Sequence, residues 1–480
     1  MQKIIIKNFG AIAYAEIEIK KVLVLIGEQA SGKSTIAKLI YFFKSLRDDL
    51  FNQIYTDKQR DYFDENLDIF KVLIEKFYHW FGSPERLPDF EIKFYYDVET
   101  ERYLNVSLNK EKIIQCESSE NFCDQSFGES ISEIKKLLQK KLFANSFHEQ
   151  LAHQQNKISY SEILSTQLNN LFNSNQVDSL FVIAGRSATV SYSELFEKYL
   201  FADVQSRLEK NSNKEFQFRI QTVDEILMLD FIKKTTDIKE FLSYYGQFDR
   251  LTFNLNKITK NKENYIEKNP YLYKNPYLYL VLKRISEILK GEYINENGEE
   301  KIIINSQEFT YLRNASSGQQ EVIRILQDIV YSIITCLKML RIVEEPEAHL
   351  FPVAQKSLIE LLALMVNQDD DNQLIITTHS PYILTVFNNL LFAQRVVDKN
   401  PSAEAEVAEL IPKEFWLKAK DFSAYSLGNA SIHEEPEYCE SIFNNQTGAI
   451  QQNYLDAVSE MLGGDFNYLY SLYAKTFRRK

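Results

Sequence analysis

The sequence predicts an α/β protein with a mainly parallel sheet, helices packed on that sheet, and a small antiparallel sheet. Three observations support this fold class. A buried-strand pattern at residues 22–26 leads through a glycine-rich loop into a helical pattern at residues 33–46. Strand and helix patterns alternate again between residues 319 and 378, as they do in parallel sheets. Residues 90–114 alternate around a polar turn, which indicates antiparallel strands.

The first part of the α/β unit is expected in residues 1–120. Residues 3–7 and 15–20 have strand patterns and precede strand 22–26 and its helix. A mostly helical insertion is expected in residues 121–290, serving as an arm or a dimerisation surface, with one strand of the main unit near residues 181–187.

The second part of the α/β unit is expected in residues 291–397. An Asn297-Gly298 pair between strand-like flanks predicts a hairpin over residues 292–304. The elements expected next are a helix at 319–340, a strand ending at 342–343, a helix at 353–366 and a strand at 374–378. Residues 398–480 are mixed and polar, and we expect them to form a C-terminal cap at the sheet edge.

Composition narrows the class of protein. A chain of 480 residues with 45% hydrophobic and 25% charged residues is typical of a globular protein with more than one substructure. Neither a leader pattern nor a run apolar enough to span a bilayer occurs, so we expect a cytoplasmic protein without a membrane partner. The net charge of −12 leaves nucleic acid only local sites. The candidates are Lys135–Lys141, Lys257–Lys268 and Arg478–Lys480, and such patches are more often solvated helix faces or fraying ends.

The glycine-rich loop carries the strongest functional signal. It matches G-x-x-x-x-G-K-[ST] with Gly27, Glu28, Gln29, Ala30, Ser31, Gly32, Lys33 and Ser34. Backbone N–H groups of such a loop surround phosphate oxygens at a helix N-terminus, where the helix dipole favours anions. We therefore expect ATP as the ligand, with Lys33 neutralising its phosphates, Ser34 coordinating Mg²⁺ and Thr35 near the α-phosphate. The alternative is a chance match in a turn, and the order of strand, loop and helix argues against it.

Two adjacent carboxylates follow the buried strand that ends at residues 342–343. Ligands of an open α/β sheet gather at the carboxyl ends of its strands. We expect Glu344 to hold Mg²⁺ and Glu345 to orient and deprotonate the attacking water. Glu347 is expected to be an acid at a helix N-terminus. The alternative for these residues is an acidic surface loop, which the upstream loop disfavours.

The order of the motifs resembles a known family. It is similar to the ABC-type heads of the SMC, RecF and OLD group, and more narrowly to the stand-alone AAA-type ATPases of bacterial phage-defence systems of the Septu and PARIS type. The resemblance covers about half of the chain and rests on Lys7–Gly10, the loop at 27–34, Ala315–Glu321, Glu344–Glu347 and Thr377–Pro381.

The resemblance implies a site shared between two subunits. In such heads a serine-glycine signature opens a helix that points at the γ-phosphate held by the opposite subunit, a role that Ser316, Gly318 and Gln319 match. The chain is thus expected to form a homodimer or a higher homo-oligomer. The alternative for Ser316 is a simple helix N-cap. His379 matches the switch histidine that contacts the γ-phosphate.

Two positions differ from the residues that the family usually has, and the role of a third is open. Glu344 stands where many ABC-type proteins have aspartate, and Phe351 where relatives often have histidine. Arg186 resembles a basic loop near the nucleotide, with a surface turn as an equal alternative.

The function expected from the resemblance is an ATP-hydrolysing homodimeric switch that controls a separate, nuclease-like effector protein in antiphage defence. One alternative is a RecF- or SMC-like ATPase of DNA repair or maintenance that binds DNA directly, and the chain's acidity weighs against it. Another is the nucleotide-binding subunit of a membrane transporter, which the large insertion disfavours.

Overall fold

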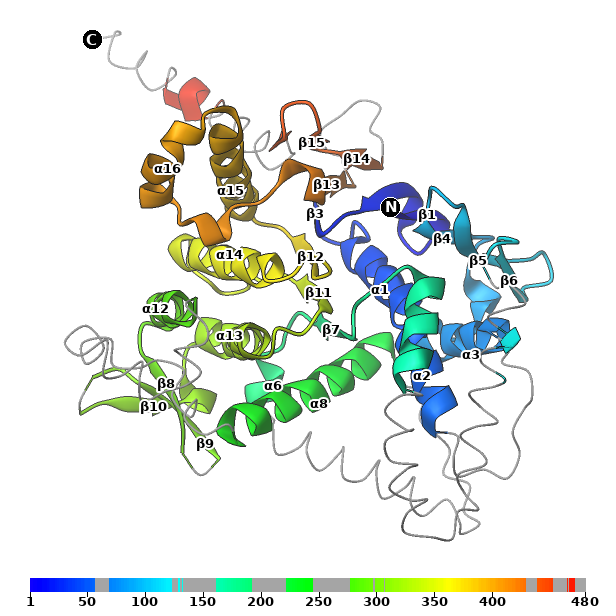
Figure 1. Cartoon of the computed structure of the whole chain (residues 1–480), viewed down its shortest axis with the longest axis horizontal. Coiled ribbons are helices and arrows are strands. Elements are labelled where there is room, and N and C mark those ends of the chain that lie inside the picture. Colours follow the sequence, from blue (N-terminus) through cyan, green and yellow to red (C-terminus); the bar gives the residue numbers. More distant parts are fainter. Residues whose placement is uncertain are drawn as a thin grey trace.

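The structure is a computed structural model (Figure 1). The basic patches at 135–141, 257–268 and 478–480, and Asn297 of the expected hairpin, lie outside the residues that it describes. The described residues are 1–56, 69–122, 128–129, 132, 161–191, 222–244, 277–296, 298–305, 307–428, 438–451, 464 and 466–470.

Six strands of the described ranges form the main sheet, in the order β14-β13-β3-β12-β11-β7. All neighbours pair in parallel except β14, which is antiparallel at one edge. This confirms the mainly parallel sheet that the sequence predicts. The strands are β3 (Val22–Gly27), β7 (Asp178–Val182), β11 (Met339–Glu344), β12 (Gln373–Thr378), β13 (Phe422–Leu427) and β14 (Cys439–Ser441).

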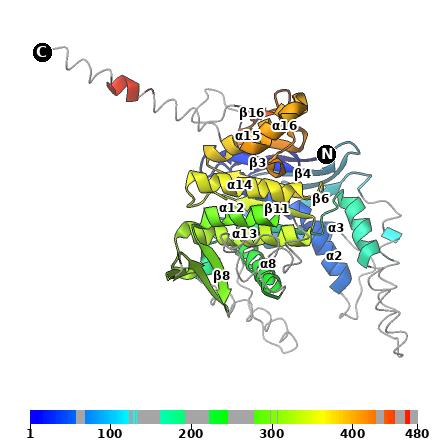
Figure 2. The ribbon, with the colours of Figure 1, turned by 60° about the vertical axis from the view of Figure 1, so that its left-hand side comes forward.

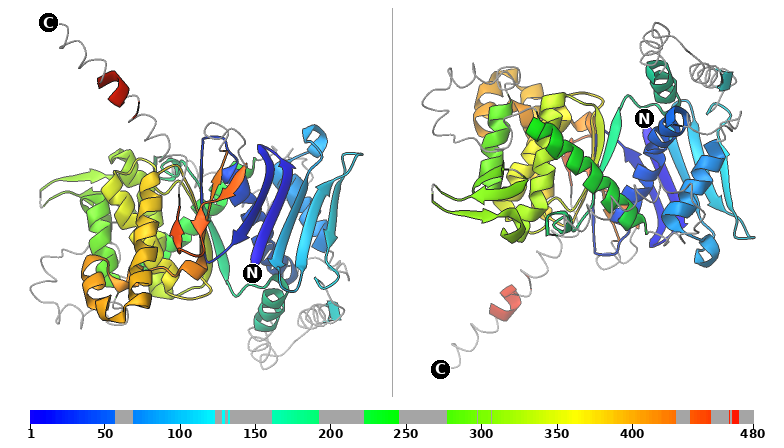
Figure 3. Two further views of the ribbon diagram at one scale, coloured as in Figure 1. Left: turned by 90° about the horizontal axis from the view of Figure 1, so that it is seen from above. Right: turned by 90° about the horizontal axis from the view of Figure 1, so that it is seen from below.

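A second, antiparallel sheet lies beside the main one, with the strand order β2-β1-β4-β5-β6. In β4 every second residue is buried, because one face of the sheet packs on the core while the other stays partly exposed. The small antiparallel sheet expected at residues 90–114 is therefore part of a larger one (Figure 3). Its strands are β1 (Gln2–Phe9), β2 (Ile12–Ile19), β4 (Glu91–Asp97), β5 (Arg102–Leu108) and β6 (Ile114–Ser118).

Helices cover both faces of the main sheet. Figure 1 shows α13, α14 and α15 on one side and α1 on the other, and Figure 2 shows α12 to α15 stacked in layers. The longer helices are α1 (Lys33–Lys44), α2 (Leu46–Thr56), α3 (Ile69–Phe81), α8 (Val223–Tyr244), α12 (Leu278–Leu289), α13 (Ser317–Thr335), α14 (Pro352–Asn367) and α15 (Pro381–Lys399). Shorter ones are α6 (Ala188–Ser191), α16 (Glu404–Leu410), residues 161–172, and the 3₁₀ turns η2 (Pro84–Arg86), η4 (Leu312–Asn314), η5 (Pro401–Ala403), η6 (Lys413–Phe415) and η7 (Ala419–Asp421).

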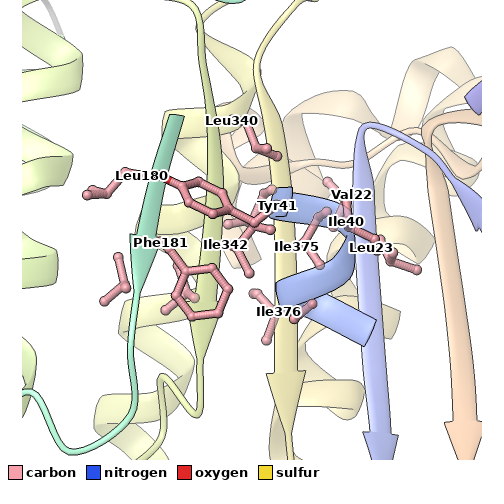
Figure 4. Close-up of a cluster of buried hydrophobic side chains, with 14 of the residues drawn as sticks. Val22, Leu23, Ile40, Tyr41, Leu180, Phe181, Leu340, Ile342, Ile375 and Ile376 are labelled. Atoms are coloured by element: carbon pink, nitrogen blue, oxygen red, sulfur yellow. The ribbon is translucent and has the colours of Figure 1, made fainter. Parts of the chain in front are cut away.

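The core is continuous from the main sheet through α1 to the antiparallel sheet. Figure 4 shows Ile40 and Tyr41 of α1 packed against apolar side chains of the main-sheet strands. On the other side of α1, Phe43 stacks on Phe94 of β4 with ring centroids 5.1 Å apart. This packing fixes α1, and with it the glycine-rich loop that precedes α1, relative to both sheets.

Two smaller sheets complete the fold. The strands β8 (Glu292–Glu296), β9 (Glu299–Ile303) and β10 (Phe309–Tyr311) form an antiparallel sheet, and β8 and β9 pair as the predicted hairpin. Gly298 adopts φ 87° in its turn, a conformation that favours glycine. Near the C-terminus, β15 (Phe443–Asn444) pairs with β16 (Ala449–Ile450).

The structure corrects two expectations about elements. The helix expected at 319–340 ends at Thr335, because Cys336 turns into the left-handed region at φ 53° and β11 begins at Met339. The C-terminal stretch does more than cap an edge, since β13 pairs in parallel with β3 inside the main sheet. Among the helices of the described ranges, none combines the length and apolar character needed to cross a membrane.

Candidate functional site

The predicted site gathers where three neighbouring parallel strands end. The glycine-rich loop follows β3, His379 follows β12, and Glu344 is the last residue of β11. Since β12 lies between β3 and β11, the carboxyl ends of the three strands bring these residues to one edge of the sheet.

Lys33 is held inside the glycine-rich loop at the start of α1. Its Nζ donates to the carbonyl oxygens of Gly27 and Glu28, at 2.9 and 2.6 Å, and lies 3.3 Å from the Ser31 hydroxyl. Burial lowers the pKa of Lys33 to about 8, while the nearby carboxylates of Glu345, Glu347 and Glu28 oppose the shift. The ammonium group is therefore held among oxygen atoms of the glycine-rich loop.

Two glycines of the loop are required by close contacts. A Cβ on Gly27, which has φ 155°, would lie 2.2 Å from the carbonyl oxygen of Leu427, the last residue of β13. A Cβ on Gly32 (φ 84°) would lie 2.8 Å from Cγ1 of Ile12. The loop thus needs glycine at both positions, because no side chain fits between it and the neighbouring strands.

The C-terminal part of the chain supports the loop from behind. The Tyr438 hydroxyl donates a 2.6 Å hydrogen bond to the Ser31 carbonyl oxygen. A Cβ on Gly428 would lie 2.7 Å from Cβ of Ser31. Sequence reasoning missed Tyr438, since a single tyrosine in a polar stretch carries no local signal of a contact with a loop 407 residues away.

Glu344 fits a divalent cation. Its carboxyl group is buried, and Oε2 accepts a 3.2 Å hydrogen bond from the Ala184 N–H. Its Oε1 is also buried and has no hydrogen-bond partner among the described residues. Burial raises the pKa of Glu344, and Lys38 and the Ser34 hydroxyl oppose the rise. A buried carboxylate oxygen with a free lone pair, close to a serine at the start of α1, is a donor set that suits Mg²⁺.

Glu345 and His379 lie beside each other at the ends of β11 and β12. His379 Nε2 lies 3.3 Å from Glu345 Oε1, and this hydrogen bond lowers the pKa of Glu345. The Glu345 N–H donates to the Thr377 carbonyl oxygen at 2.9 Å, which joins the ends of β11 and β12. The arrangement presents an ionised carboxylate beside an imidazole at the edge of the sheet.

Glu347 has a different role from the expected one. It precedes α14, which begins at Pro352, by a full turn, so it is not an acid at that helix N-terminus. Its Oε1 accepts hydrogen bonds from the Thr378 hydroxyl at 2.6 Å and from the His379 N–H at 2.8 Å. Glu347 therefore fixes the turn that carries His379.

Arg186 is completely buried, which rules out the surface turn. Its guanidinium donates to the carbonyl oxygens of Glu321, Glu344 and Glu345 at 2.8, 3.0 and 3.1 Å. It also lies 3.5 Å from the carboxylate of Glu321, whose other oxygen accepts from the Ser187 N–H. Arg186 thus links α13 to the backbone of both carboxylate residues of the site.

The signature residues form a helix cap within their own chain. Ser316 is the N-cap of α13: its hydroxyl accepts from the Gln319 N–H at 3.3 Å, and the Gln319 side chain accepts from the Ser316 N–H at 3.1 Å. A Cβ on Gly318 would lie 2.6 Å from the His349 carbonyl oxygen, so only glycine fits there. Within the described ranges, none of these three residues forms a hydrogen bond with residues 27–35.

A family model described as AAA ATPase domain matches residues 1–384, well over half of the chain. The chain belongs to the AAA ATPase domain family. Membership in this family confirms the ATPase domain expected from the glycine-rich loop, and ATPases of this kind bind nucleotide and typically Mg²⁺. None of the curated proteins matches the sequence significantly.

Solved structures of SMC heads resemble the chain at low similarity. An SMC head bound to the C-terminal winged-helix domain of ScpA has 13% identity and a TM-score of 0.33, with 80% of this chain and 90% of that chain covered. An SMC head from Pyrococcus furiosus with an extended coiled coil, bound to the C-terminal domain of ScpA, has 14% identity, a TM-score of 0.32 and coverage of 80% and 92%. An SMC head from Thermotoga maritima has 12% identity, a TM-score of 0.31 and coverage of 80% and 90%.

Proposed function

We propose that this protein is an ATP-hydrolysing molecular switch of the ABC type whose complete site is formed by two copies of the chain. The observation that carries the proposal is the pairing of Glu345 with His379, next to Lys33 and at the carboxyl ends of adjacent parallel strands. A carboxylate that stays ionised, an imidazole and a buried cation at one sheet edge are the groups that phosphoanhydride hydrolysis requires.

Each residue has a role that follows from its surroundings. The Lys33 ammonium would exchange its carbonyl acceptors for the β- and γ-phosphates of ATP, while Ser34 and Glu344 would hold Mg²⁺. Mg²⁺ would neutralise negative charge on the phosphates. Glu345 would accept a proton from the attacking water, and its lowered pKa keeps it ionised for that purpose. His379, which contacts Glu345, would respond to the presence or loss of the γ-phosphate.

Exposed side chains near this edge of the sheet support the binding of a second copy of the chain. Ser316 is exposed at the start of α13, and the first turns of α14 and α15 begin at the same edge, where their strands end. Phe351, which is the N-cap of α14, Val353 in the first turn of α14 and Tyr382 in the first turn of α15 are 76%, 62% and 54% exposed. Large apolar side chains grouped beside a polar site are typical of a surface that another protein covers. A second copy would bring its Ser316, Gly318 and Gln319 to the phosphates.

The wider role is proposed from the resemblance stated above. We propose that the nucleotide state of the dimer, in the cytoplasm, holds or releases a separate nuclease-like effector protein in antiphage defence. A test is co-expression with proteins encoded by neighbouring genes, followed by affinity capture with and without ATP. If no neighbouring product binds in either nucleotide state, this role is wrong while the ATPase proposal stands.

Two substitutions test the ATPase proposal. Lys33→Ala is expected to abolish ATP binding in calorimetry, because the phosphate charge is left uncompensated. Glu345→Gln is expected to keep ATP affinity within about threefold while lowering kcat by at least about 100-fold, since the amide keeps the shape and loses the base. The matched control is Glu111→Gln, an exposed glutamate in the turn between β5 and β6. Hydrolysis by Glu345→Gln at the parent rate would show that another residue is the base.

A further inference from the structure

A short helical segment near the C-terminus exposes large apolar side chains. Phe466, Tyr468, Leu469 and Tyr470 are 67%, 66%, 63% and 63% exposed. Figures 1, 2 and 3 all show this segment standing apart from the body of the molecule. Large exposed apolar side chains close together, such as Phe466, Leu469 and Tyr470, are typical of a surface that another protein covers.

The segment has the pattern of a helix that binds a groove. The rings of Phe466 and Tyr470 stack with centroids 6.4 Å apart, which places them on one face. The sequence continues the same spacing with Tyr473 and Phe477, at i+7 and i+11 from Phe466. Residues 466–480 contain no acidic residue but four cations, Lys475, Arg478, Arg479 and Lys480, in a chain with a net charge of −12. We call residues 466–480 the aromatic-basic segment.

A groove between α14, α15 and α16 has the complementary character. It has a volume of about 350 Å³ and is lined mainly by apolar side chains, among them Leu390, Val396 and Ile411. At its rim, Phe392 is 61% and Leu410 is 80% exposed. The groove therefore offers apolar surface of the kind that aromatic anchors of a helix bind.

The charge of the rim also matches. Helix α16 carries Glu404, Glu406 and Glu409 and no cation. Glu404 is paired with Lys413, whereas Glu406 and Glu409 are exposed and form no ion pair within the described part of the chain. Two free carboxylates beside an apolar groove favour a ligand that combines aromatic and basic side chains.

We propose that the aromatic-basic segment of one copy docks in the α14–α16 groove of a second copy. The aromatic face would fill the groove, and the cations would lie against Glu406 and Glu409. Each buried aromatic side chain removes about 150–250 Å² from water. Two reciprocal contacts with four aromatics each therefore reach the roughly 1,200–2,000 Å² of a stable interface. This contact involves none of the residues of the ATP site, so it forms without nucleotide.

Cysteine cross-linking tests the contact between copies. Leu410→Cys and Tyr470→Cys, both at exposed positions, are mixed under mild oxidation without ATP. We expect a disulfide-linked dimer of the two variants. We expect the same dimer in a Lys33→Ala background, where the ATP site is already inactive, so the result does not depend on that site. Tyr470→Cys mixed with Glu111→Cys is the matched control and should not link. The proposal is overturned if the mixture gives no link, or if a Leu410→Cys/Tyr470→Cys double variant links only within single chains at dilution.

Charge reversal tests the specificity of the contact. Glu406→Lys with Glu409→Lys should weaken nucleotide-free self-association at least about tenfold in sedimentation experiments, since like charges replace opposite ones. Mixing this variant with Lys475→Glu/Arg478→Glu protein should restore a heterodimer. Unchanged self-association would overturn the proposal. The proposal would also be overturned if the aromatic-basic segment bound phosphatidylserine vesicles or single-stranded DNA and its removal left self-association unchanged.

Discussion

Glu345 adopts a backbone conformation that residues with a Cβ rarely take, at φ 42°. Such a conformation costs about 1–3 kcal/mol and persists only where the surroundings hold it. Here the Glu345 carbonyl oxygen accepts from Arg186 and from the Ala348 N–H, and its own N–H binds the Thr377 carbonyl oxygen. The strained backbone therefore places the carboxylate outside the sheet edge, where His379 reaches it.

Arg186→Lys tests whether this positioning matters. A lysine cannot donate to all four carbonyl oxygens that the planar guanidinium contacts, so Glu345 should lose its fixed position. We expect kcat to fall at least about tenfold while KM for ATP changes less than about threefold, because the loop and Lys33 remain intact. Steady-state kinetics measure both values, and thermal unfolding checks that the variant is folded. A rise in KM that matches the fall in kcat would contradict the positioning role.

The pKa of Lys33 gives a pH dependence. In the free protein this pKa is about 8, whereas bound ATP favours the ammonium form. Below pH 8 the lysine is already charged and its contribution to binding is constant. Above pH 8 it must gain a proton on binding, so the affinity should fall about tenfold per pH unit until the pKa of the complex is reached. Calorimetry in buffers with different ionisation heats should detect uptake of about one proton at pH 9. A flat affinity without uptake would show that Lys33 is charged throughout.

The role of a site residue could be predicted where the residues that it contacts are close to it in sequence. The loop at 27–34 is contiguous, so its spacing alone indicates phosphate binding. Arg186 was ambiguous because its partner Glu321 lies 135 residues away. Glu347 was misinterpreted because its partner Thr378 belongs to the next strand, 31 residues on. Such contacts depend on strand order, which periodicity does not reveal.

At the scale of elements, β13 decides how the glycine-rich loop is supported. It pairs with the whole of β3 and ends at Leu427, against Gly27. The sequence of residues 422–427 is short and mixed, so nothing local distinguished a central strand from a cap. The end of α13 could not be predicted either. Cys336 adopts the left-handed backbone conformation that ends the helix, and a glycine usually occupies this position.

Tyr438→Phe tests the support from the C-terminal part. It removes the hydrogen bond to the Ser31 carbonyl oxygen and leaves the ring in place. A lost hydrogen bond of about 0.5–1.5 kcal/mol should weaken ATP binding about two- to tenfold, since the loop is held less rigidly. Tyr425→Phe is the matched control: this hydroxyl accepts from the Glu18 N–H, away from the loop. Equal ATP affinities for both variants would mean that Tyr438 supports only the fold.

At the scale of the molecule, the parallel strands of the main sheet all end at the same edge of the sheet. They come from distant parts of the chain, at residues 22–27, 178–182, 339–344, 373–378 and 422–427. The parallel sheet was predictable, because strands and helices alternate. The larger antiparallel sheet could be predicted only in part, because β1 pairs with β4, which follows it in the chain only after α1, α2 and α3. The assembled edge presents an exposed Ser316 that caps its own helix and a loop at 27–35 with which it shares no hydrogen bond in the described chain.

This separation leads to a prediction for mixed dimers. Lys33→Ala and Ser316→Arg proteins should each be inactive, the first because it cannot bind phosphate, the second because it puts bulk and a misplaced cation against the phosphates of the other copy. In a mixed dimer one site combines both defects and the other has neither. Mixing folded parents should therefore restore a part of the hydrolysis rate, up to about a quarter of the parent rate for random exchange of equal amounts with independent sites.

The outcomes of mixing distinguish three mechanisms. Recovery of hydrolysis requires that Lys33 of one copy and Ser316 of another act in the same site, because neither inactive protein holds an intact pair by itself. If subunits exchange and no activity returns, the two sites must act together, or Ser316 serves only as the cap of α13. If Ser316→Arg alone hydrolyses ATP at the parent rate, each chain completes its own site. The second copy would then have no part in catalysis, even if the two chains associate.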